Sequence, residues 1–403
     1  MKAIEILREI MRDYFKGLDG HPRVAWCTSV GPAEILRSFG FEVFFPENHG
    51  AVIGASKMAE MFISTAAQRG FSNHICSYTT SDIGSYLMGK TPLQDKFGIR
   101  GVPEPSLIVY CTNQCREVQD WFSFYGEEFG CPVVGIHPPR HLGEITEEDV
   151  QQVVHQFRCL IRVCEEVTGE KFDEDRFKET VKLSKEATLL WQEVLKTAAN
   201  IPSPITFFDG VVLMAPIVVL RGTQVAKNFY EVALKELQEK VLRCEAAVPQ
   251  ERVRVFWDGM PIWGKLRMLS ELFKEKKCAI VASTYCNSWI FDAFDENDPL
   301  RTTALAYTQI FINRNEKVKM EMLVNWVKEY KADGIIFHDS KTCFNNSNAR
   351  FGMPQRISEK YGIPTLVIEG DLNDMRFFSE QQSITKIETF IEQLEERKIA
   401  VNG

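Results

Sequence analysis

The chain has 403 residues, of which 45% are hydrophobic and 25% charged, and its net charge is -8. The composition is that of a globular protein, and the length predicts two or three folded units. A negative charge without a Lys- and Arg-rich segment argues against a nucleic-acid or membrane-surface partner, and no apolar run is long enough to span a membrane. The first residues, MKAIEILREIMRDYFKGL, carry charges throughout, unlike a signal peptide, so a cytoplasmic location is expected.

Eight short runs of β-branched and aromatic residues are predicted strands, each followed by a segment with helical periodicity. Four lie in the N-terminal part, at 23–28, 42–46, 106–111 and 131–137, and four in the C-terminal part, at 253–259, 278–284, 333–339 and 365–371. Continuous apolar strands that alternate with helices are typical of parallel sheets covered on both faces. The sequence therefore predicts an α/β protein with two doubly wound, Rossmann-like parallel-sheet domains joined by a helical segment.

The region between the two sets of strands is helical and charged. We expect an N-terminal α/β domain at 1–145, a helical connecting region at 146–250 and a C-terminal α/β domain at 251–403. Residues 201–223 read IPSPITFFDGVVLMAPIVVLRGT, whose Pro, Gly and apolar residues predict a buried connector rather than a flexible linker. This connector is a candidate for part of a subunit interface or a substrate channel, with plain core packing as the alternative.

The eleven cysteines are not expected to form disulfides, because the cytoplasm keeps thiols reduced. Four of them fall at predicted core positions of helices or strands: Cys159, Cys164, Cys244 and Cys278. Cys76 lies in a turn-like segment, and five more stand at or just past the end of a predicted strand: Cys27, Cys111, Cys115, Cys286 and Cys343. Ligands of open parallel sheets bind at these strand ends, where helix N-termini lower the pKa of a thiol. These thiols are therefore candidate metal ligands.

Four interpretations of the strand-end thiols stay open on spacing alone. Zinc sites use paired cysteines with short separations, whereas here Cys111 and Cys115 have possible partners hundreds of residues away. A nucleophilic cysteine needs a positioned imidazole, for which His74 and His338 are candidates. An iron–sulfur cluster accepts thiolates from several distant loops. Plain burial is the fourth interpretation.

Acids and hydroxyls gather at similar positions. Ser29 follows the first predicted strand, and Glu47, Asn48 and His49 follow the second, in FFPENHG. A Glu after a Pro at a strand end is commonly a helix cap, but a carboxylate in a cleft is also a candidate general base with a raised pKa. No GxxxxGK[ST] loop and no GxGxxG after a strand is present, so this chain is not expected to hydrolyse ATP or to bind a nicotinamide.

Six segments occur together in one order along nearly the whole chain. They are PENHG, GFSNHICSYTTSDIG, CTNQCREVQDWF, the connector at 201–223, ENDPLRTTALAY at 296–307, and HDSKTCFNNSNARFGMPQRISEKYGIPTLVIEGDLNDMRFFSEQQ. In these segments the chain resembles the larger, α-type subunit of the 2-hydroxyacyl-CoA dehydratase and benzoyl-CoA reductase family.

The resemblance implies a [4Fe–4S] cluster held by Cys76, Cys115 and Cys343, with one iron left without a protein ligand. Cys111 is then a packed neighbour of Cys115. Two further cysteines, Cys27 and Cys286, resemble ligands of related double-cubane proteins. Because FINRNEK at 311–317 replaces the other cysteine pair of those proteins, a single cubane is expected.

The resemblance also implies a reaction, the radical elimination of water from an (R)-2-hydroxyacyl-CoA to give the enoyl-CoA. One electron converts the thioester carbonyl to a ketyl radical anion, the α-hydroxyl leaves to the open iron, and a carboxylate removes the β-hydrogen. Loss of one electron then releases the enoyl-CoA, so the electron is recycled rather than consumed. Ser29 would donate a hydrogen bond to the carbonyl oxygen and Glu47 would be the base. His74 and Asn113 are candidates for tuning the cluster by hydrogen bonds, with ordinary loop chemistry as the alternative.

The implied partners are an acyl-CoA thioester, a smaller homologous cluster-bearing subunit in a heterodimer, and a transient ATP-hydrolysing iron–sulfur activator that supplies the electron. Two other functions remain open. One is a benzoyl-CoA reductase-type subunit that passes electrons to an aromatic acyl-CoA, and the other is an electron-relay subunit whose cluster never meets substrate. The Ser at position 29 favours dehydration, because the reductase relatives keep the Glu and lose the Ser.

Overall fold

The computed structural model describes residues 2–402 and confirms the predicted α/β class with two parallel sheets. The first sheet contains β1 (Val24–Cys27), β2 (Glu42–Phe44), β3 (Leu107–Cys111) and β4 (Val133–Ile136), in the order β2-β1-β3-β4. The second contains β5 (Val253–Asp258), β6 (Cys278–Ser283), β7 (Gly334–Ser340) and β8 (Thr365–Gly370), in the order β6-β5-β7-β8. All eight predicted strands are present within about two residues of their expected bounds.

The two sheets share one topology. Trp26 of β1 pairs with Phe44 of β2 on one side and with Ile108 of β3 on the other, and β5 lies between β6 and β7 in the same way. In each sheet the chain moves from the first strand to one neighbour and then crosses to the opposite side. A crevice therefore forms beyond the carboxyl ends of β1 and β3, and another beyond β5 and β7, which is where ligands of such sheets bind.

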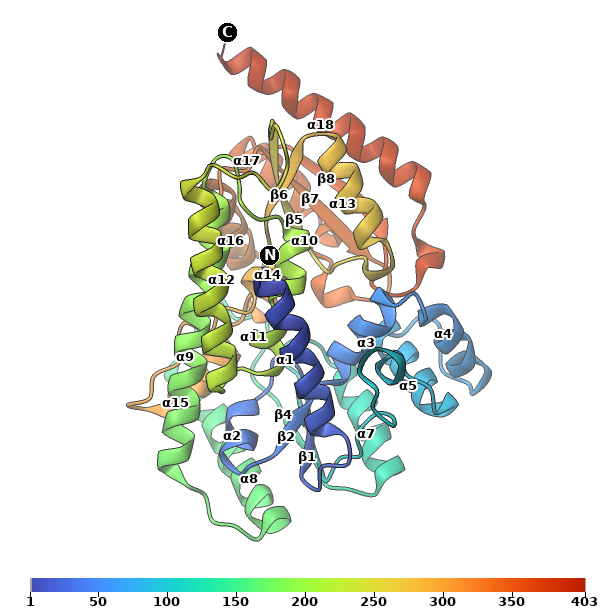
Figure 1. Cartoon of the computed structure of the whole chain (residues 1–403), viewed down its shortest axis with the longest axis vertical. Helices are drawn as coiled ribbons and strands as arrows, with labels where there is room; N and C mark the ends of the chain where they lie inside the picture. The colour runs from blue at the N-terminus through green and yellow to red at the C-terminus, as the bar shows by residue number, and fades with distance from the viewer. Residues whose placement is uncertain (1, 403) are drawn as a thin grey trace.

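Helices cover both sheets (Figure 1). Those of the N-terminal part are α1 (Lys2–Leu18), α2 (Ala33–Ser38), α3 (Pro46–Ala55), α4 (Ala59–Gln68), α5 (Ser77–Met88), α6 (Pro92–Phe97) and α7 (Glu117–Phe129). Those of the C-terminal part are α13 (Leu266–Glu275), α14 (Thr284–Asn287), α15 (Pro299–Thr308), α16 (Glu316–Glu329), α17 (Met353–Tyr361) and α18 (Glu380–Asn402). In the part of the chain that the structure describes, no helix is both long and apolar enough to cross a membrane.

The connecting region consists of α8 (Glu147–Thr168), α9 (Glu174–Lys196), α10 (Phe207–Leu213), α11 (Ala215–Val219) and α12 (Gln224–Leu242). Helices α9 and α12 pack against each other and run along one side of the molecule beside both sheets (Figure 1). Helix α8 begins at a capping box of Thr146 and Asp149, and the second sheet begins at Val253. These positions support domain boundaries near 145 and 250, which we retain as a proposal.

A single hydrophobic core joins the connecting region to both sheets. Trp26 of β1 packs edge-on against Tyr125 of α7, and Trp257 of β5 stacks on Phe207 of α10 with ring centroids 5.5 Å apart. Because both tryptophans are fully buried, each sheet is fixed to its helices by a large apolar contact area. The two sheets therefore hold a defined position relative to one another.

Two of the four cysteines predicted at core positions are fully buried, namely Cys164 and Cys278. Cys159 is half-buried, and the prediction for Cys244 is wrong because its side chain is exposed. Helix α12 ends at Leu242, and Cys244 adopts a left-handed φ of 52° just beyond that end. The prediction assumed that the helix continues through Cys244 and turns its side chain toward the core. Because the helix ends two residues earlier, that assumption fails.

Candidate functional site

Two adjoining cavities lie between the carboxyl ends of the two sheets. We call one, of about 90 Å³, the cysteine cavity, and the other, of about 120 Å³, the apolar chamber. Both are lined by the same six residues, Glu47, Tyr78, Gln114, Met260, Ile312 and Asn346, so they share a boundary. Four of the six come after strands of one sheet or the other, Glu47 and Gln114 after β2 and β3, and Met260 and Asn346 after β5 and β7. The paired cavities therefore combine the two crevices.

The cysteine cavity is lined by Cys76, Cys115 and Cys343, the three cysteines singled out by the family resemblance. Cys76 directly precedes α5, Cys115 follows β3 and Cys343 follows β7. The remaining strand-end cysteines do not line this cavity and are buried in the core: Cys27, Cys111 and Cys286. Residues from distant parts of the sequence and from both sheets thus meet at one place.

Each of the three cavity cysteines stands just before a helical turn. Cys76 precedes α5, Cys115 precedes α7 by two residues, and Cys343 precedes the 3-10 turn η4 (Phe344–Asn346). Backbone N–H groups of these turns donate to the three sulfurs, from Thr79, from Val118 and Glu117, and from Asn346. Helix N-termini and N–H donors favour the thiolate form, which is the form that binds metals.

Burial outweighs these donors in the thiols themselves. It raises the pKa of Cys115 and of Cys343 to about 12, and it raises the pKa of Cys76 well above the ordinary range. The cysteines also raise one another's pKa, because three negative charges around one cavity repel each other. A positively charged group must therefore enter before these thiols ionise together at neutral pH, and its binding would release protons.

Two carboxylates fix the loops that carry the cysteines. Glu117, in the first turn of α7, accepts a hydrogen bond from the backbone N–H of Cys76. Asp371, fully buried just past β8, accepts the Ser77 hydroxyl on one oxygen and the Thr342 N–H (2.8 Å) and hydroxyl (2.7 Å) on the other. Since Ser77 follows Cys76 and Thr342 precedes Cys343, Asp371 joins the two halves of the cysteine cavity.

We expect Asp371→Asn to destabilise the protein by about 3 kcal/mol, because the amide would face N–H and O–H donors that now share a buried carboxylate. The measurement is the midpoint of urea-induced unfolding. Asp120→Asn is the control, since Asp120 forms an exposed ion pair with Arg116 and a pair of that kind contributes about 0–1 kcal/mol. Equal unfolding midpoints for the two variants would show that Asp371 does not join the halves.

The three thiols fit a polynuclear metal group. Among residues 2–402, no group of three or more His, Cys, Asp or Glu side chains converges closely enough to hold one metal ion. An iron–sulfur cluster makes a different demand, because each cysteine binds a different iron and the sulfurs surround a shared space. Three cysteines around one buried cavity, each with an N–H donor, meet that demand.

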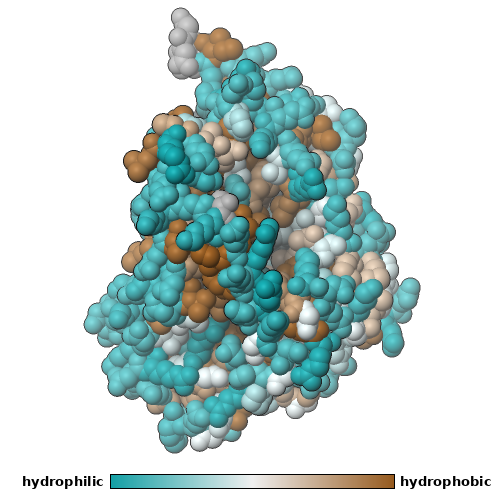
Figure 2. Space-filling view, in the orientation of Figure 1, coloured by the Kyte–Doolittle hydropathy of each residue, from teal (hydrophilic) through white to brown (hydrophobic). Residues whose placement is uncertain are grey.

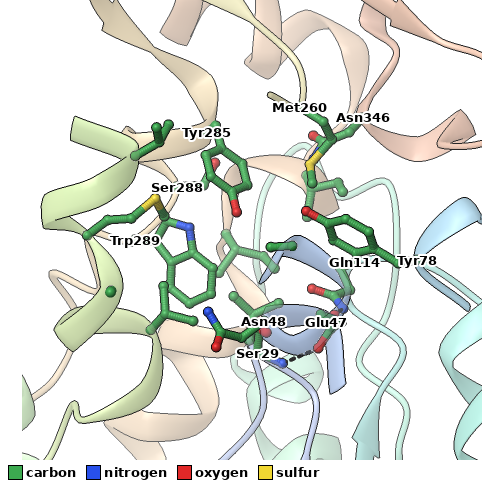
Figure 3. Close-up of a pocket in the computed structure, with 18 of the residues that line it drawn as sticks. Ser29, Glu47, Asn48, Tyr78, Gln114, Met260, Tyr285, Ser288, Trp289 and Asn346 are labelled. Atoms are coloured by element: carbon green, nitrogen blue, oxygen red, sulfur yellow. Dashed lines mark hydrogen bonds between the residues drawn. The ribbon is translucent and has the colours of Figure 1, made fainter. Parts of the chain in front are cut away.

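The apolar chamber contains the predicted acid and hydroxyl. Ser29 lies in the turn after β1, and Glu47 lies in the first turn of α3. The Ser29 backbone N–H and the Gln114 side-chain amide donate to the two oxygens of the Glu47 carboxylate, and Figure 3 shows all three residues together. Burial raises the pKa of Glu47 to about 7, although hydrogen bonds from Ser29 and the Arg221 charge oppose this rise. A carboxyl group with that pKa exchanges protons readily near neutral pH.

Helix α3 is held close to α5 by two features of the PENHG segment. A Cβ atom on Gly50 would lie 2.9 Å from the Tyr78 ring, so only glycine permits this approach. His49 is fully buried and binds Asp82 through Nδ1 (2.5 Å) and Thr91 through Nε2 (2.7 Å). These contacts place Glu47 of α3 beside the cysteine cavity that begins at the N-terminus of α5.

The rest of the chamber wall is mostly apolar. The connector at 201–223 contributes four side chains that line the chamber and also belong to or pack against the core: Val211, Met214, Ala215 and Val218. Tyr78 and Tyr285 also face the chamber (Figure 3). Burial raises the pKa of both phenols, so both are neutral O–H donors. No Lys, Arg or His lines the chamber in the described part of the chain.

Three residues considered from the sequence do not line the cysteine cavity. The side chain of His74 is exposed to solvent. The buried Asn113 amide donates to the carbonyls of Val30 (3.0 Å) and Tyr307 (2.8 Å), and the buried His338 Nδ1 pairs with the Met260 carbonyl (2.7 Å). Both buried residues therefore stabilise loops rather than act on the sulfurs.

Gln114, Glu117 and Asp371 are residues of the site that sequence reasoning missed. Gln114 stands beside Cys115 in the CTNQC segment, where an amide next to a candidate ligand was a usable signal. Asp371 carried no such signal, because an Asp after a strand is common and its partners Ser77 and Thr342 are remote in sequence.

The known proteins that this chain is similar to include subunits of acyl-CoA dehydratases and of a benzoyl-CoA reductase. The sequence model of the family described as "2-hydroxyglutaryl-CoA dehydratase, D-component" matches residues 28–394. The (R)-2-hydroxyisocaproyl-CoA dehydratase alpha subunit of Clostridioides difficile is 28% identical over 397 residues, 98% of this chain and 95% of that protein. A benzoyl-CoA reductase subunit of Thauera aromatica is 29% identical over 381 residues, 91% of this chain and 87% of that protein. The (R)-phenyllactyl-CoA dehydratase beta subunit of Clostridium sporogenes is 26% identical over 261 residues, 59% of this chain and 62% of that protein.

Proposed function

Because the chain belongs to the 2-hydroxyglutaryl-CoA dehydratase D-component family, we propose that it is the α subunit of a 2-hydroxyacyl-CoA dehydratase, a hydro-lyase. The substrate would be an (R)-2-hydroxyacyl-CoA and the product the enoyl-CoA. The observation that carries the proposal is the cavity lined by three cysteines, which adjoins the chamber that contains Ser29 and Glu47. A relative named as a dehydratase alpha subunit matches 98% of the chain, which supports the α rather than the β role.

Cys76, Cys115 and Cys343 would hold a [4Fe–4S] cluster in the cysteine cavity. When bound, such a cluster supplies one-electron chemistry and, at an iron without a protein ligand, a Lewis acid for an oxygen atom. The chain's own residues set the conditions around it. The Ser77 and Thr342 contacts to Asp371 hold the ligand loops, and the N–H donors of the helical turns favour thiolate sulfur.

Glu47 would be the base that takes the β-proton of the substrate. Its pKa of about 7 leaves a large fraction ionised in a buried site, and the Gln114 amide and Ser29 N–H fix its orientation. The Ser29 hydroxyl would donate to the thioester carbonyl oxygen as negative charge develops there. The apolar wall around both residues excludes water, which strengthens these interactions.

The chamber wall indicates the acyl group. A second carboxylate on the substrate would lack a counter-charge, since no Lys, Arg or His of the described residues lines the chamber. The apolar chamber has a volume of about 120 Å³, somewhat smaller than the ~150 Å³ of a cavity that binds benzene. We therefore expect an uncharged aliphatic or aromatic acyl group, rather than the dicarboxylic acyl group in the family's name.

The function requires partners. The similarity to a beta subunit supports a heteromeric assembly with a smaller homologous subunit, which would carry a second cluster. An ATP-hydrolysing iron–sulfur activator would supply the low-potential electron, because this sequence has no phosphate-binding loop of its own. Eleven free cysteines and an electron-driven reaction suit the reducing cytoplasm of an anaerobic cell.

The test is an anaerobic assay of the complete system with two substrates of similar length, 2-hydroxy-4-methylpentanoyl-CoA and 2-hydroxyglutaryl-CoA. We expect kcat/KM to favour the uncharged substrate by about 10²-fold or more, as leaving a charge buried and unpaired implies. Less than one electron per enoyl-CoA indicates dehydration, whereas one or more electrons consumed per product, with benzoyl-CoA as acceptor, would identify a reductase. A preference for the dicarboxylic substrate would contradict the chamber argument.

A further inference from the structure

A third cavity lies at the surface and adjoins the apolar chamber. Its volume is about 730 Å³, and we call it the α1 groove because residues of α1 form one wall. Five residues line both the groove and the apolar chamber: Asn48, Ala51, Val211, Ala215 and Trp263. The groove and the chamber therefore lie side by side, as binding of one ligand across both would require.

Three cations line this groove. Arg8 and Arg12 stand four residues apart on α1, so they project from the same face of that helix, and Lys96 comes from α6. The stacked rings of Phe15 and Phe97, with centroids 4.5 Å apart, pack the two helices together and hold the three cations around one space. Figure 2 shows polar side chains along this face of the molecule beside a recess with hydrophobic residues at its floor.

The charge of the groove is unbalanced. No Asp or Glu of the described residues lines it, and this includes the acidic residues of α1 itself: Glu5, Glu9 and Asp13. Within residues 2–402, Arg8, Arg12 and Lys96 form no ion pair with any carboxylate. In a protein with a net charge of -8, three gathered cations without anionic partners indicate an anionic ligand.

We propose that the α1 groove binds the phosphate groups of coenzyme A, with Arg8, Arg12 and Lys96 as the contacting cations. The inference rests on the proposed function for the identity of the ligand. Coenzyme A carries a diphosphate and a 3′-phosphate at one end and a long, narrow pantetheine arm at the other. Cations at the mouth match the phosphates, and the apolar floor that continues into the chamber matches the arm and the acyl group.

The test measures binding of free coenzyme A to the full chain, purified with its companion subunit, by titration calorimetry. We expect the double variant Arg8→Ala/Arg12→Ala to weaken binding at least tenfold and to raise KM for the acyl-CoA by a similar factor, with kcat at saturation changed far less. Lys16→Ala is the matched control, because Lys16 lies on the same helix, is exposed and does not line the groove. It should bind coenzyme A like the unmodified protein.

Two further ligands test which part of coenzyme A the groove recognises. Dephospho-coenzyme A should bind more weakly than coenzyme A, and inorganic phosphate at the same concentration should not compete. Equal coenzyme A binding by the double variant and the unmodified chain, or loss of subunit association instead of ligand binding, would overturn the groove assignment. The titration needs neither turnover nor an electron donor, so it tests the groove separately from the reaction. If the double variant binds coenzyme A more weakly than the unmodified protein but the unmodified protein does not dehydrate its substrate, the proposed function is refuted and the groove assignment stands.

Discussion

Replacing Cys115 by Ala should remove the bound iron and sulfide and abolish turnover. Cys115 lines the cysteine cavity, and its sulfur accepts N–H donors from the start of α7. Two remaining cysteines cannot hold a cubane that depends on three. The measurement is iron and acid-labile sulfide content with visible absorbance after anaerobic purification, followed by the dehydration assay.

Cys111→Ala is the matched control, because Cys111 is four residues away at the end of β3 and is fully buried outside the cavity. It should retain most of the iron and most of the activity, with a modest loss of stability of about 1 kcal/mol for the smaller buried side chain. Far-ultraviolet circular dichroism of both variants separates loss of the cluster from loss of the fold. If Cys111→Ala loses the iron and Cys115→Ala keeps it, the ligand assignment is wrong, although the chain still belongs to the family.

Glu47→Gln should lower kcat by about 10²-fold or more while substrate binding survives, since the amide keeps the shape of the side chain but cannot accept a proton. The pH profile gives a second measurement. With a pKa of about 7 for Glu47, kcat/KM should rise about tenfold per pH unit below that value and level off above it, because the ionised form is the base. The variant should lose this dependence.

Glu60→Gln, on the exposed face of α4, is the control for the Glu47 variant. It replaces the same chemical group near the same helices without touching either cavity. It should leave both kcat and the pH profile unchanged. A Glu47→Gln enzyme with normal turnover, or with the ascending limb of its profile intact, would show that another group takes the proton.

The sequence predicted the two sheets well, because strands buried on both faces are continuous apolar runs that need no knowledge of the partner strand. Strands such as Val253–Asp258 and Cys278–Ser283 are buried along their whole length. Cys244 shows the limit of this reasoning, since its burial depended on where α12 ends, and the periodic pattern did not mark that residue.

The site was only partly predictable. Strand ends and the family resemblance together indicated Cys76, Cys115 and Cys343, and the structure places all three on one cavity. Pairings between remote residues had no local signal. The Glu117 contact to Cys76 and the Asp371 contacts to Ser77 and Thr342 depend on how the two sheets face each other, which no periodicity in the chain records.

The division of the cysteine cavity between two sheets affects the order of events during biosynthesis. Cys76 and Cys115 leave the ribosome with the first sheet, whereas Cys343 follows β7, late in the chain. A nascent chain that has finished only its first half thus offers two thiols, and the third arrives when the second sheet has been synthesised and has docked. If the chain holds the cluster that we propose, its insertion would have to wait for nearly the entire polypeptide, and truncated chains would be excluded from maturation.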